Sequence, residues 1–322
     1  YTFGARYIRR SIMLTVPPKV APPKSTALLR ELMVRPGVID CPSIFDPISA
    51  RIAESLGFKC VSLEGSALGI ATCQVEAALS LEDFAKAVRS ITAVISIPLI
   101  VDAGGGFGEP AHVFNTIRVL EHAGAAGVHI EDQIFPKRFH YFADSRVDVI
   151  PAEIMIDKIR CAAEARRDPD FVIIGRTDTI KTHDINEGIR RGNLYWEAGA
   201  DMVMLFPNTV EEAKRAAKEI PAPLNYVNAE HGESRRPNFS VAELETMGYK
   251  VLYHPSGAIL LACKAVKDAF SELKEAGHIT MDPKVFSSFR QDIYGLMGLP
   301  NDYRIEKEPN CLGSASSNGG KP

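Results

Sequence analysis

Eight short runs rich in β-branched residues recur along the chain, separated by stretches with the spacing of amphipathic helices. The runs lie at residues 37–42, 59–65, 98–106, 126–132, 171–178, 201–208, 223–230 and 250–257. The helical spacing is clearest at residues 46–57, 81–94, 112–124, 152–167 and 209–220. Strands that alternate with helices eight times predict an α/β fold, a parallel (β/α)8 TIM barrel. A doubly wound open sheet would usually have fewer strands and a phosphate-loop glycine pattern after its first strand, and this sequence has neither feature.

The same pattern divides the 322 residues into four segments. We expect an N-terminal arm over 1–27, the barrel over 28–280 and a helical segment over 281–308. The last residues, 309–322, have the small and polar composition of a disordered tail.

Composition excludes several classes of partner. A formal charge of −3 argues against nucleic acid, and the longest apolar run, residues 91–101, is too short for a membrane span. Six scattered cysteines without a CxxC pair predict reduced thiols and a cytoplasmic location. Three early arginines, Arg6, Arg9 and Arg10, leave a mitochondrial signal open as an alternative.

Charged and polar residues follow the predicted strands, and in such a barrel all the strands end at one rim, where active sites lie. The strand-end residues are Asp46, Glu64, Asp102, Glu131, Asp132, Arg176, Asp178, Asn208, Asn228, Glu230, His254 and Ser256. Acids crowded at one rim repel each other and lose hydration, which costs free energy. A divalent cation, or an anionic substrate held by Arg176, would offset that cost.

Two simpler interpretations compete with a binding site. Glu131 and Asp132 could cap the helix that follows the fourth strand, which is common for acids at helix starts. Arg176 and Asp178 could form a structural ion pair on the rim.

Five motifs, taken in order, resemble the isocitrate lyase / phosphoenolpyruvate mutase superfamily over about residues 28–300. They are SARIAESLGFKCVSLEGSALG, PLIVDAGGGFGEP, GVHIEDQIFPKR, VIIGRTD and ELETMGYKVLYHPSGAILLACKAV. The resemblance implies a (β/α)8 barrel enzyme and does not select one member of the superfamily.

The resemblance also implies roles for individual residues. Asp102 matches the main Mg²⁺-coordinating aspartate, and Glu131 matches a glutamate that reaches the metal, usually through water. Arg176 matches the arginine that grips a substrate carboxylate. The remaining predicted site residues are Gly65 and Ser66 in a loop whose N–H groups hold the substrate, Lys137 and Arg138 at the start of a gating loop, and Asn228, Glu230 and Ser256 as further strand-end contacts.

Departures from the superfamily pattern at four positions affect the expected chemistry. Gly104 stands where the family usually has the second aspartate of Asp-x-Asp. Glu64 or Asp132 could supply the missing carboxylate. The alternative is that the protein binds the metal weakly. Phe139 stands where lyase members have a proton-transferring cysteine, so His140 or Tyr141 becomes the expected acid–base group. The other departures are Glu76 in place of an aspartate and Asn208 in place of a glutamate.

The sequence therefore predicts a carbon–carbon lyase that acts on a small 2-hydroxy or 2-oxo dicarboxylate through an enolate stabilised by Mg²⁺ or Mn²⁺. Hydrolysis or decarboxylation of oxaloacetate is the first alternative, followed by a phosphonomutase and by a divergent barrel with altered chemistry. The resemblance further implies a homotetramer that swaps a C-terminal helix near residues 282–298.

Overall fold

The computed structural model describes residues 24–138, 147–229 and 236–307. The chain divides into two units, one formed by Pro23–Thr280 and the other containing the helices that follow Met281. The predicted tail over 309–322 and most of the predicted arm over 1–27 lie outside the described residues.

Eight parallel strands form one sheet in the order β1-β8-β7-β6-β5-β4-β3-β2, which confirms the predicted TIM barrel. An isolated parallel bridge between Ser43 and Ser62 joins the two edge strands. The strands are β1 Ile39–Pro42, β2 Val61–Leu63, β3 Leu99–Asp102, β4 Gly127–Glu131, β5 Val172–Arg176, β6 Met202–Met204, β7 Leu224–Val227 and β8 Tyr249–His254. Each coincides with one of the eight predicted runs to within two residues at its start.

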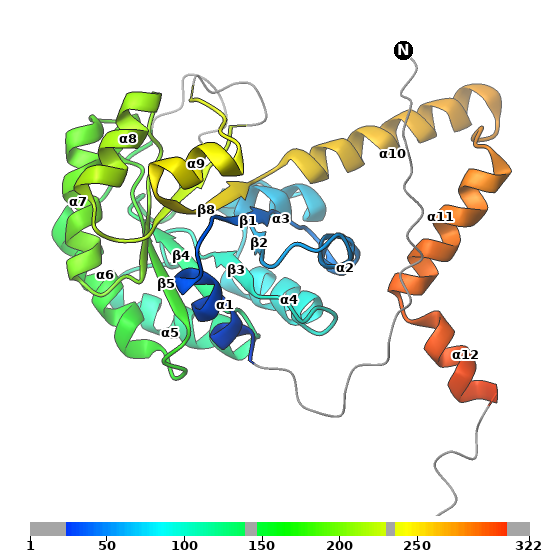
Figure 1. The fold of residues 1–322 in the computed structure, drawn as a ribbon, viewed down its shortest axis with the longest axis horizontal. Helices are drawn as coiled ribbons and strands as arrows, with labels where there is room; N and C mark the ends of the chain where they lie inside the picture. The colour runs from blue at the N-terminus through cyan, green and yellow to red at the C-terminus, as the bar shows by residue number, and fades with distance from the viewer. Residues whose placement is uncertain (1–23, 139–146, 230–235, 308–322) are drawn as a thin grey trace, which may run out of the picture. The chain divides into compact units, whose positions relative to one another are not determined.

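Helices surround this sheet (Figure 1). They are α1 Ser25–Val34, α2 Pro47–Ser55, α3 Gly65–Thr72, α4 Leu81–Thr92, α5 Pro110–His122, α6 Ala152–Ala165, α7 Ile185–Glu197, α8 Val210–Glu219, α9 Val241–Met247 and α10 Gly257–Ala276. Side-chain caps fix several helix starts, as at Asp46 of α2, Ser80 of α4 and Ser240 of α9, each of which accepts a hydrogen bond from a backbone N–H of the first turn. Asp46 is thus engaged in capping.

Two apolar layers hold the barrel together. Alternate residues of each strand point inward, where Cys41, Ile100, Ile174 and Met204 belong to one buried cluster. The other face of each strand packs on the helices, as Val128 and its neighbours do. None of the helices within the described ranges is long and apolar enough to cross a bilayer.

The helix after the last strand departs from the usual pattern of the fold. α10 runs away from the barrel instead of lying along β8 (Figure 1), and only Ile259 of its 20 residues is buried. The second unit contains α11 Pro283–Leu296 and α12 Leu299–Lys307, and neither helix has a buried residue.

Gly127 at the start of β4 allows a close approach between β4 and β5. A Cβ atom there would lie 2.8 Å from both the Cβ and the carbonyl oxygen of Val172. We expect Gly127→Ala to lower the free energy of unfolding by about 1–3 kcal/mol, because the backbone of β5 must shift. Urea denaturation followed by circular dichroism measures this, and an unchanged midpoint would contradict the close approach.

Candidate active site

The carboxyl ends of four neighbouring strands bring acids and a cation together at one rim. Strand register places Asp102 of β3 beside His129 of β4, and Glu131 of β4 beside Arg176 of β5. Glu64 directly follows β2. All of these side chains are buried.

Arg176 is the central cation of this rim. Its guanidinium lies 2.9 Å from Glu131, 3.0 Å from Asp178 and 3.7 Å from Asp102, and it stacks 4.9 Å from the centroid of the Phe206 ring. Burial alone would lower the pKa of Arg176, but these carboxylates outweigh it and raise the pKa well above its usual value. The contact with Asp178 confirms the predicted ion pair between Arg176 and Asp178. The contacts with Glu131 and Asp102 show that Arg176 also has partners beyond this pair.

Glu64, Asp102 and His129 form a second cluster beside Arg176. The imidazole Nε2 of His129 lies 3.2 Å from Glu64 Oε2, and its Nδ1 lies 3.5 Å from Asp102 Oδ1. Backbone N–H groups of Gly104 and Gly65 donate to Asp102 at 2.8 and 3.3 Å. Burial lowers the pKa of His129, but the two carboxylates outweigh it and raise the pKa above the ordinary value.

Asp132, the neighbour of Glu131, does not face this cluster. Its carboxylate accepts hydrogen bonds from the hydroxyls of Thr177 and Tyr195, both at 2.7 Å, from the backbone N–H of Asp178 at 2.9 Å and from Arg191 at 3.1 Å. These partners belong to the end of β5 and to α7. Asp132 therefore fixes the end of β5, the strand that carries Arg176, against α7.

The alternative in which Glu131 and Asp132 cap the next helix is wrong. α6 begins only at Ala152, and Pro151 occupies the capping position. The two adjacent acids have different partners because successive side chains of a strand point to opposite faces.

Lys137 reaches back from the start of the predicted gate into the rim. Its ammonium pairs with Glu76 and lies 3.0 Å from Glu131. Burial by itself lowers the pKa of Lys137, but these acids raise it above its usual value, so the ammonium stays charged. Glu76 also packs against Gly65, where an added Cβ would lie 2.5 Å from Glu76 Cγ. Only glycine fits there without a shift.

The other predicted site residues differ in their placement. Ser66 and Ser256 lie next to each other, with their hydroxyl oxygens 3.1 Å apart. Asn228 exchanges two hydrogen bonds of 3.0 Å with the backbone of Phe239, which occupies both ends of its amide. Arg138 pairs with Asp148 at 2.6 Å.

Three predicted residues, His140, Tyr141 and Glu230, lie outside the described residues. Their roles stay predictions.

Sequence comparison identifies the family. The family model described as phosphoenolpyruvate phosphomutase matches residues 29–274. The chain belongs to this family. It is 34% identical over 280 residues to 2,3-dimethylmalate lyase of Eubacterium barkeri, covering 84% of this chain and 94% of that protein. It is also 34% identical over 281 residues to 2-methylisocitrate lyase of Aeropyrum pernix, covering 86% and 88%.

Structural comparison agrees with the family membership. A structure of oxaloacetate acetylhydrolase in complex with the inhibitor 3,3-difluorooxalacetate has a TM-score of 0.81 and 27% identity, over 91% of this chain and 99% of that one. The resemblance to the isocitrate lyase / phosphoenolpyruvate mutase superfamily is thereby confirmed, as is the prediction of an enzyme, since its relatives are carbon–carbon lyases or related enzymes.

Members of this superfamily depend on a metal ion, and the rim has a suitable donor set. Glu64, Asp102 and His129 each offer a ligand atom, and these atoms lie within 4.8 Å of one another. The Oε1 atom of Glu64 and the Nδ1 atom of His129 are buried without a hydrogen-bond partner, which an ion would supply. A small cavity of about 30 Å³ lies on the other side of Asp102, where Gly104, Glu76 and Lys137 line it and Glu64 and His129 do not. The residues fit a metal.

His129 is the residue that the sequence interpretation missed. A usable signal existed, because Glu131 was expected to face the site and residues two apart on a strand share a face. In the sequence, an imidazole inside the apolar run of β4 resembles a core residue.

The brace around Asp132 should contribute strongly to stability. Asp132→Ala removes the shared acceptor of Thr177, Tyr195 and Arg191, and Glu187 remains as the only carboxylate beside Arg191 among the described residues. Because buried donors then lack an acceptor, we expect the free energy of unfolding to fall by about 3–5 kcal/mol in urea denaturation. The matched control is Asp157→Ala, which removes an exposed acid of α6 and should change stability by less than about 0.5 kcal/mol. A loss below about 1 kcal/mol for Asp132→Ala would contradict the bracing role.

Proposed function

We propose that this protein is a carbon–carbon lyase that cleaves a small 2-hydroxy or 2-oxo dicarboxylate with the help of a bound Mg²⁺ ion. The observation that carries the proposal is the convergence of Asp102, His129, Glu131 and Arg176 on one buried rim. Two relatives of similar length are named 2,3-dimethylmalate lyase and 2-methylisocitrate lyase. A rim that combines a cation site with a buried guanidinium suits a substrate that carries carboxylates.

Arg176 is the residue that we assign to the substrate carboxylate. In the present structure its guanidinium neutralises Glu131 and Asp102. If Glu131 and Asp102 were neutralised by a bound divalent cation, one edge of the guanidinium would be free to bind a carboxylate through two parallel hydrogen bonds. Asp178 at 3.0 Å keeps the other edge in place. Metal and substrate would therefore bind in a coupled way.

A Mg²⁺ ion bound at Asp102 would supply the positive charge that stabilises an enolate. The surrounding residues hold the substrate in place. The backbone of Gly65 and the hydroxyls of Ser66 and Ser256 lie on the β2 and β8 side of the rim, opposite the position of Arg176 in strand order. Lys137, kept charged by its two acids, adds a second cation for the carboxylates.

The proton-transferring group of this proposal is His140 or Tyr141 in the gate. Phe139 occupies the place of the cysteine that lyase relatives carry, and a phenyl ring transfers no proton. Glu230 completes the proposed substrate contacts. Asn228 acts indirectly, because its amide is bonded to the backbone of Phe239 and fixes that segment. We also propose a cytoplasmic location, on the basis of the scattered cysteines.

Hydrolysis or decarboxylation of oxaloacetate is the second candidate. The observation that favours it is Phe139, because decarboxylation lets solvent protonate the enolate and needs no acid from the gate. The likeness to a structure of oxaloacetate acetylhydrolase supports it as well.

A panel of substrates separates the two candidates. The purified protein would be incubated with 2-methylisocitrate, 2,3-dimethylmalate, oxaloacetate and phosphonopyruvate, with Mg²⁺ or with EDTA. Pyruvate released from either of the first two, and only with Mg²⁺, supports the lyase. Oxalate released from oxaloacetate supports the hydrolase. Activity that survives EDTA would contradict the metal-assisted reaction.

Arg176→Lys should weaken substrate binding strongly. The substitution replaces a fork of two parallel hydrogen bonds by a single point charge, and we expect a loss of about 2–3 kcal/mol. Steady-state kinetics on the best substrate of the panel would reveal it as a raised KM. An unchanged KM would remove Arg176 from the carboxylate site.

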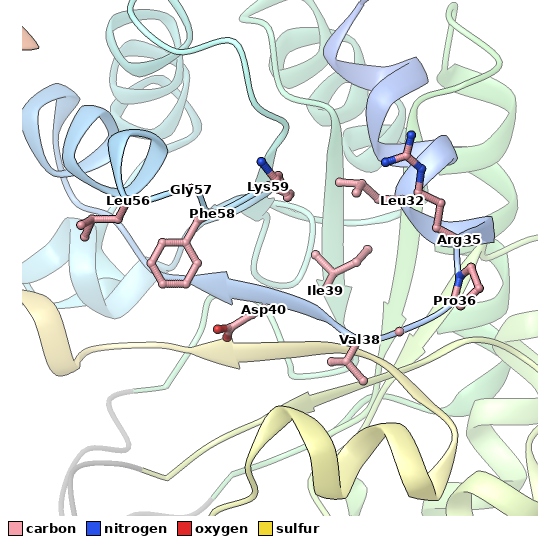
Figure 2. Close-up of a pocket in the computed structure, with 11 residues that line it drawn as sticks. Leu32, Arg35, Pro36, Val38, Ile39, Asp40, Leu56, Gly57, Phe58 and Lys59 are labelled. Atoms are coloured by element: carbon pink, nitrogen blue, oxygen red, sulfur yellow. The ribbon is translucent and has the colours of Figure 1, made fainter. Parts of the chain in front are cut away.

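We further propose that the protein is a homotetramer in which C-terminal helices of one copy dock on the barrel of another. A cavity of about 370 Å³ lies at the amino ends of β1 and β2, and Leu56, Phe58 and Val38 are among the residues lining it (Figure 2). In a regular barrel the helix after β8 would lie beside β1, but α10 runs away from the barrel (Figure 1). α10 and α11 carry exposed apolar residues, including Phe270 at 64% and Phe286 at 54% exposure.

Substitution of these apolar residues tests the assembly. Phe270→Asp and Phe286→Asp should each shift the protein to a smaller species in size-exclusion chromatography with light scattering, because a charge would have to enter an apolar interface. Lys267→Ala, which lies on α10 with Phe270, is the control and should leave the mass of the assembly unchanged. If the phenylalanine variants keep the mass of the parent protein, the proposed docking is wrong.

A further inference from the structure

We propose that Glu64 is a direct ligand of the metal ion, and that its carboxylate takes the place of the acid that is missing at Gly104. The inference rests on the proposed function in one respect, namely that a divalent cation binds at this rim. It adds that the end of β2 supplies, as a direct ligand, the carboxylate that the loop after β3 lacks in this chain.

The first support is the set of buried atoms without partners. Glu64 is 8% exposed and His129 is 0% exposed. Glu64 Oε1 and His129 Nδ1 have no hydrogen-bond partner among the described residues. Each such atom costs about 1–3 kcal/mol when it is buried alone. A cation that contacts both atoms would remove this cost. Glu131 Oε1 is a third such atom of the rim, but the ammonium of Lys137 lies 3.0 Å from it.

The second support is that the other acids of the rim are already occupied. Asp132 accepts four hydrogen bonds from α7 and the end of β5. Asp178 is held by Arg176 and Lys181. Asp132 was the other candidate substitute at the sequence level, and its saturated carboxylate removes it from the choice.

Glu131 and Glu76 are paired with cations, and Glu131 also accepts a hydrogen bond from the side-chain amide of Gln133 at 3.2 Å. Lys137 pairs with both of them, and Arg176 lies 2.9 Å from Glu131. Glu64 has a different partner, since its Oε2 lies 3.2 Å from an imidazole nitrogen. In the tautomer that carries its proton on Nε2, this contact is a hydrogen bond to Glu64 and the Nδ1 lone pair is free to bind a metal.

The third support is the space around Gly104. A Cβ atom added there meets nothing within 4 Å, although the residue has φ +50. Aspartate tolerates this backbone conformation better than most residues do. A carboxylate at position 104 would therefore be sterically possible near Asp102. This chain places glycine there and places its acid at Glu64 on the neighbouring strand.

Direct metal binding tests this inference without the use of activity. The metal-free, full-length protein would be titrated with Mn²⁺, and the free ion would be followed by its electron paramagnetic resonance signal. Glu64→Gln keeps the shape of the side chain and the contact with His129 but removes the charge. We expect it to weaken Mn²⁺ binding by at least about tenfold, whereas Asp157→Asn, the distant control, should leave the binding unchanged.

A second variant pair tests the relocation itself. We expect Gly104→Asp combined with Glu64→Gln to recover binding to within about threefold of the parent protein. Circular dichroism of each metal-free variant checks that it is folded, and Gly104→Asp alone, which keeps Glu64, serves as the folded reference if Glu64→Gln is unstable. When Gly104→Asp is already present, adding Glu64→Gln should weaken Mn²⁺ binding less than Glu64→Gln does in the parent protein.

The possible outcomes separate this inference from the proposed function. If the parent protein and the folded Glu64→Gln variant bind Mn²⁺ equally, Glu64 is not a ligand, and the metal-assisted lyase is unaffected. If the parent protein itself binds no Mn²⁺, both the metal dependence and the role of Glu64 are wrong. Weakened binding in Glu64→Gln with recovery by Gly104→Asp supports the relocated ligand.

Discussion

The buried guanidinium of Arg176 is the interaction on which the rim depends. Three carboxylates, those of Glu131, Asp178 and Asp102, lie within 3.7 Å of it. Acids this close could not all stay ionised in a buried place without a countercharge. The arginine therefore makes a dense acidic rim possible.

The adjacent acids Glu131 and Asp132 make different contacts around this arginine. Glu131 points into the barrel and pairs with Arg176, whereas Asp132 points outward and binds Tyr195 and Arg191 of α7. The alternation of side chains along a strand accounts for the division. The hydrogen bonds of Asp132 on the outer face of β4 thereby fix the end of β5. This positions Arg176 of β5 against the acids of the inner face.

Much of the barrel was predictable from the sequence. The eight strands follow from β-branched runs separated by amphipathic helices, and parallel strands that end at one rim place Asp102, Glu131 and Arg176 together. His129 was predictable in principle from the parity of β4 but was missed. The departure of α10 from the barrel could not be read from its residues, because the same apolar pattern fits a helix that packs on its own barrel or on another copy.

The sequence by itself determined which strands form, in which order, and which acids reach the rim, since strand formation and side-chain parity are local properties of the chain. Only the tertiary structure decided what each acid does. Asp132 is occupied by groups 59 and 63 residues away in the sequence, and Glu64 meets His129 across 65 residues. The partner of a buried carboxylate depends on distances between strands and helices that are remote in the chain, and no spacing of residues encodes those distances.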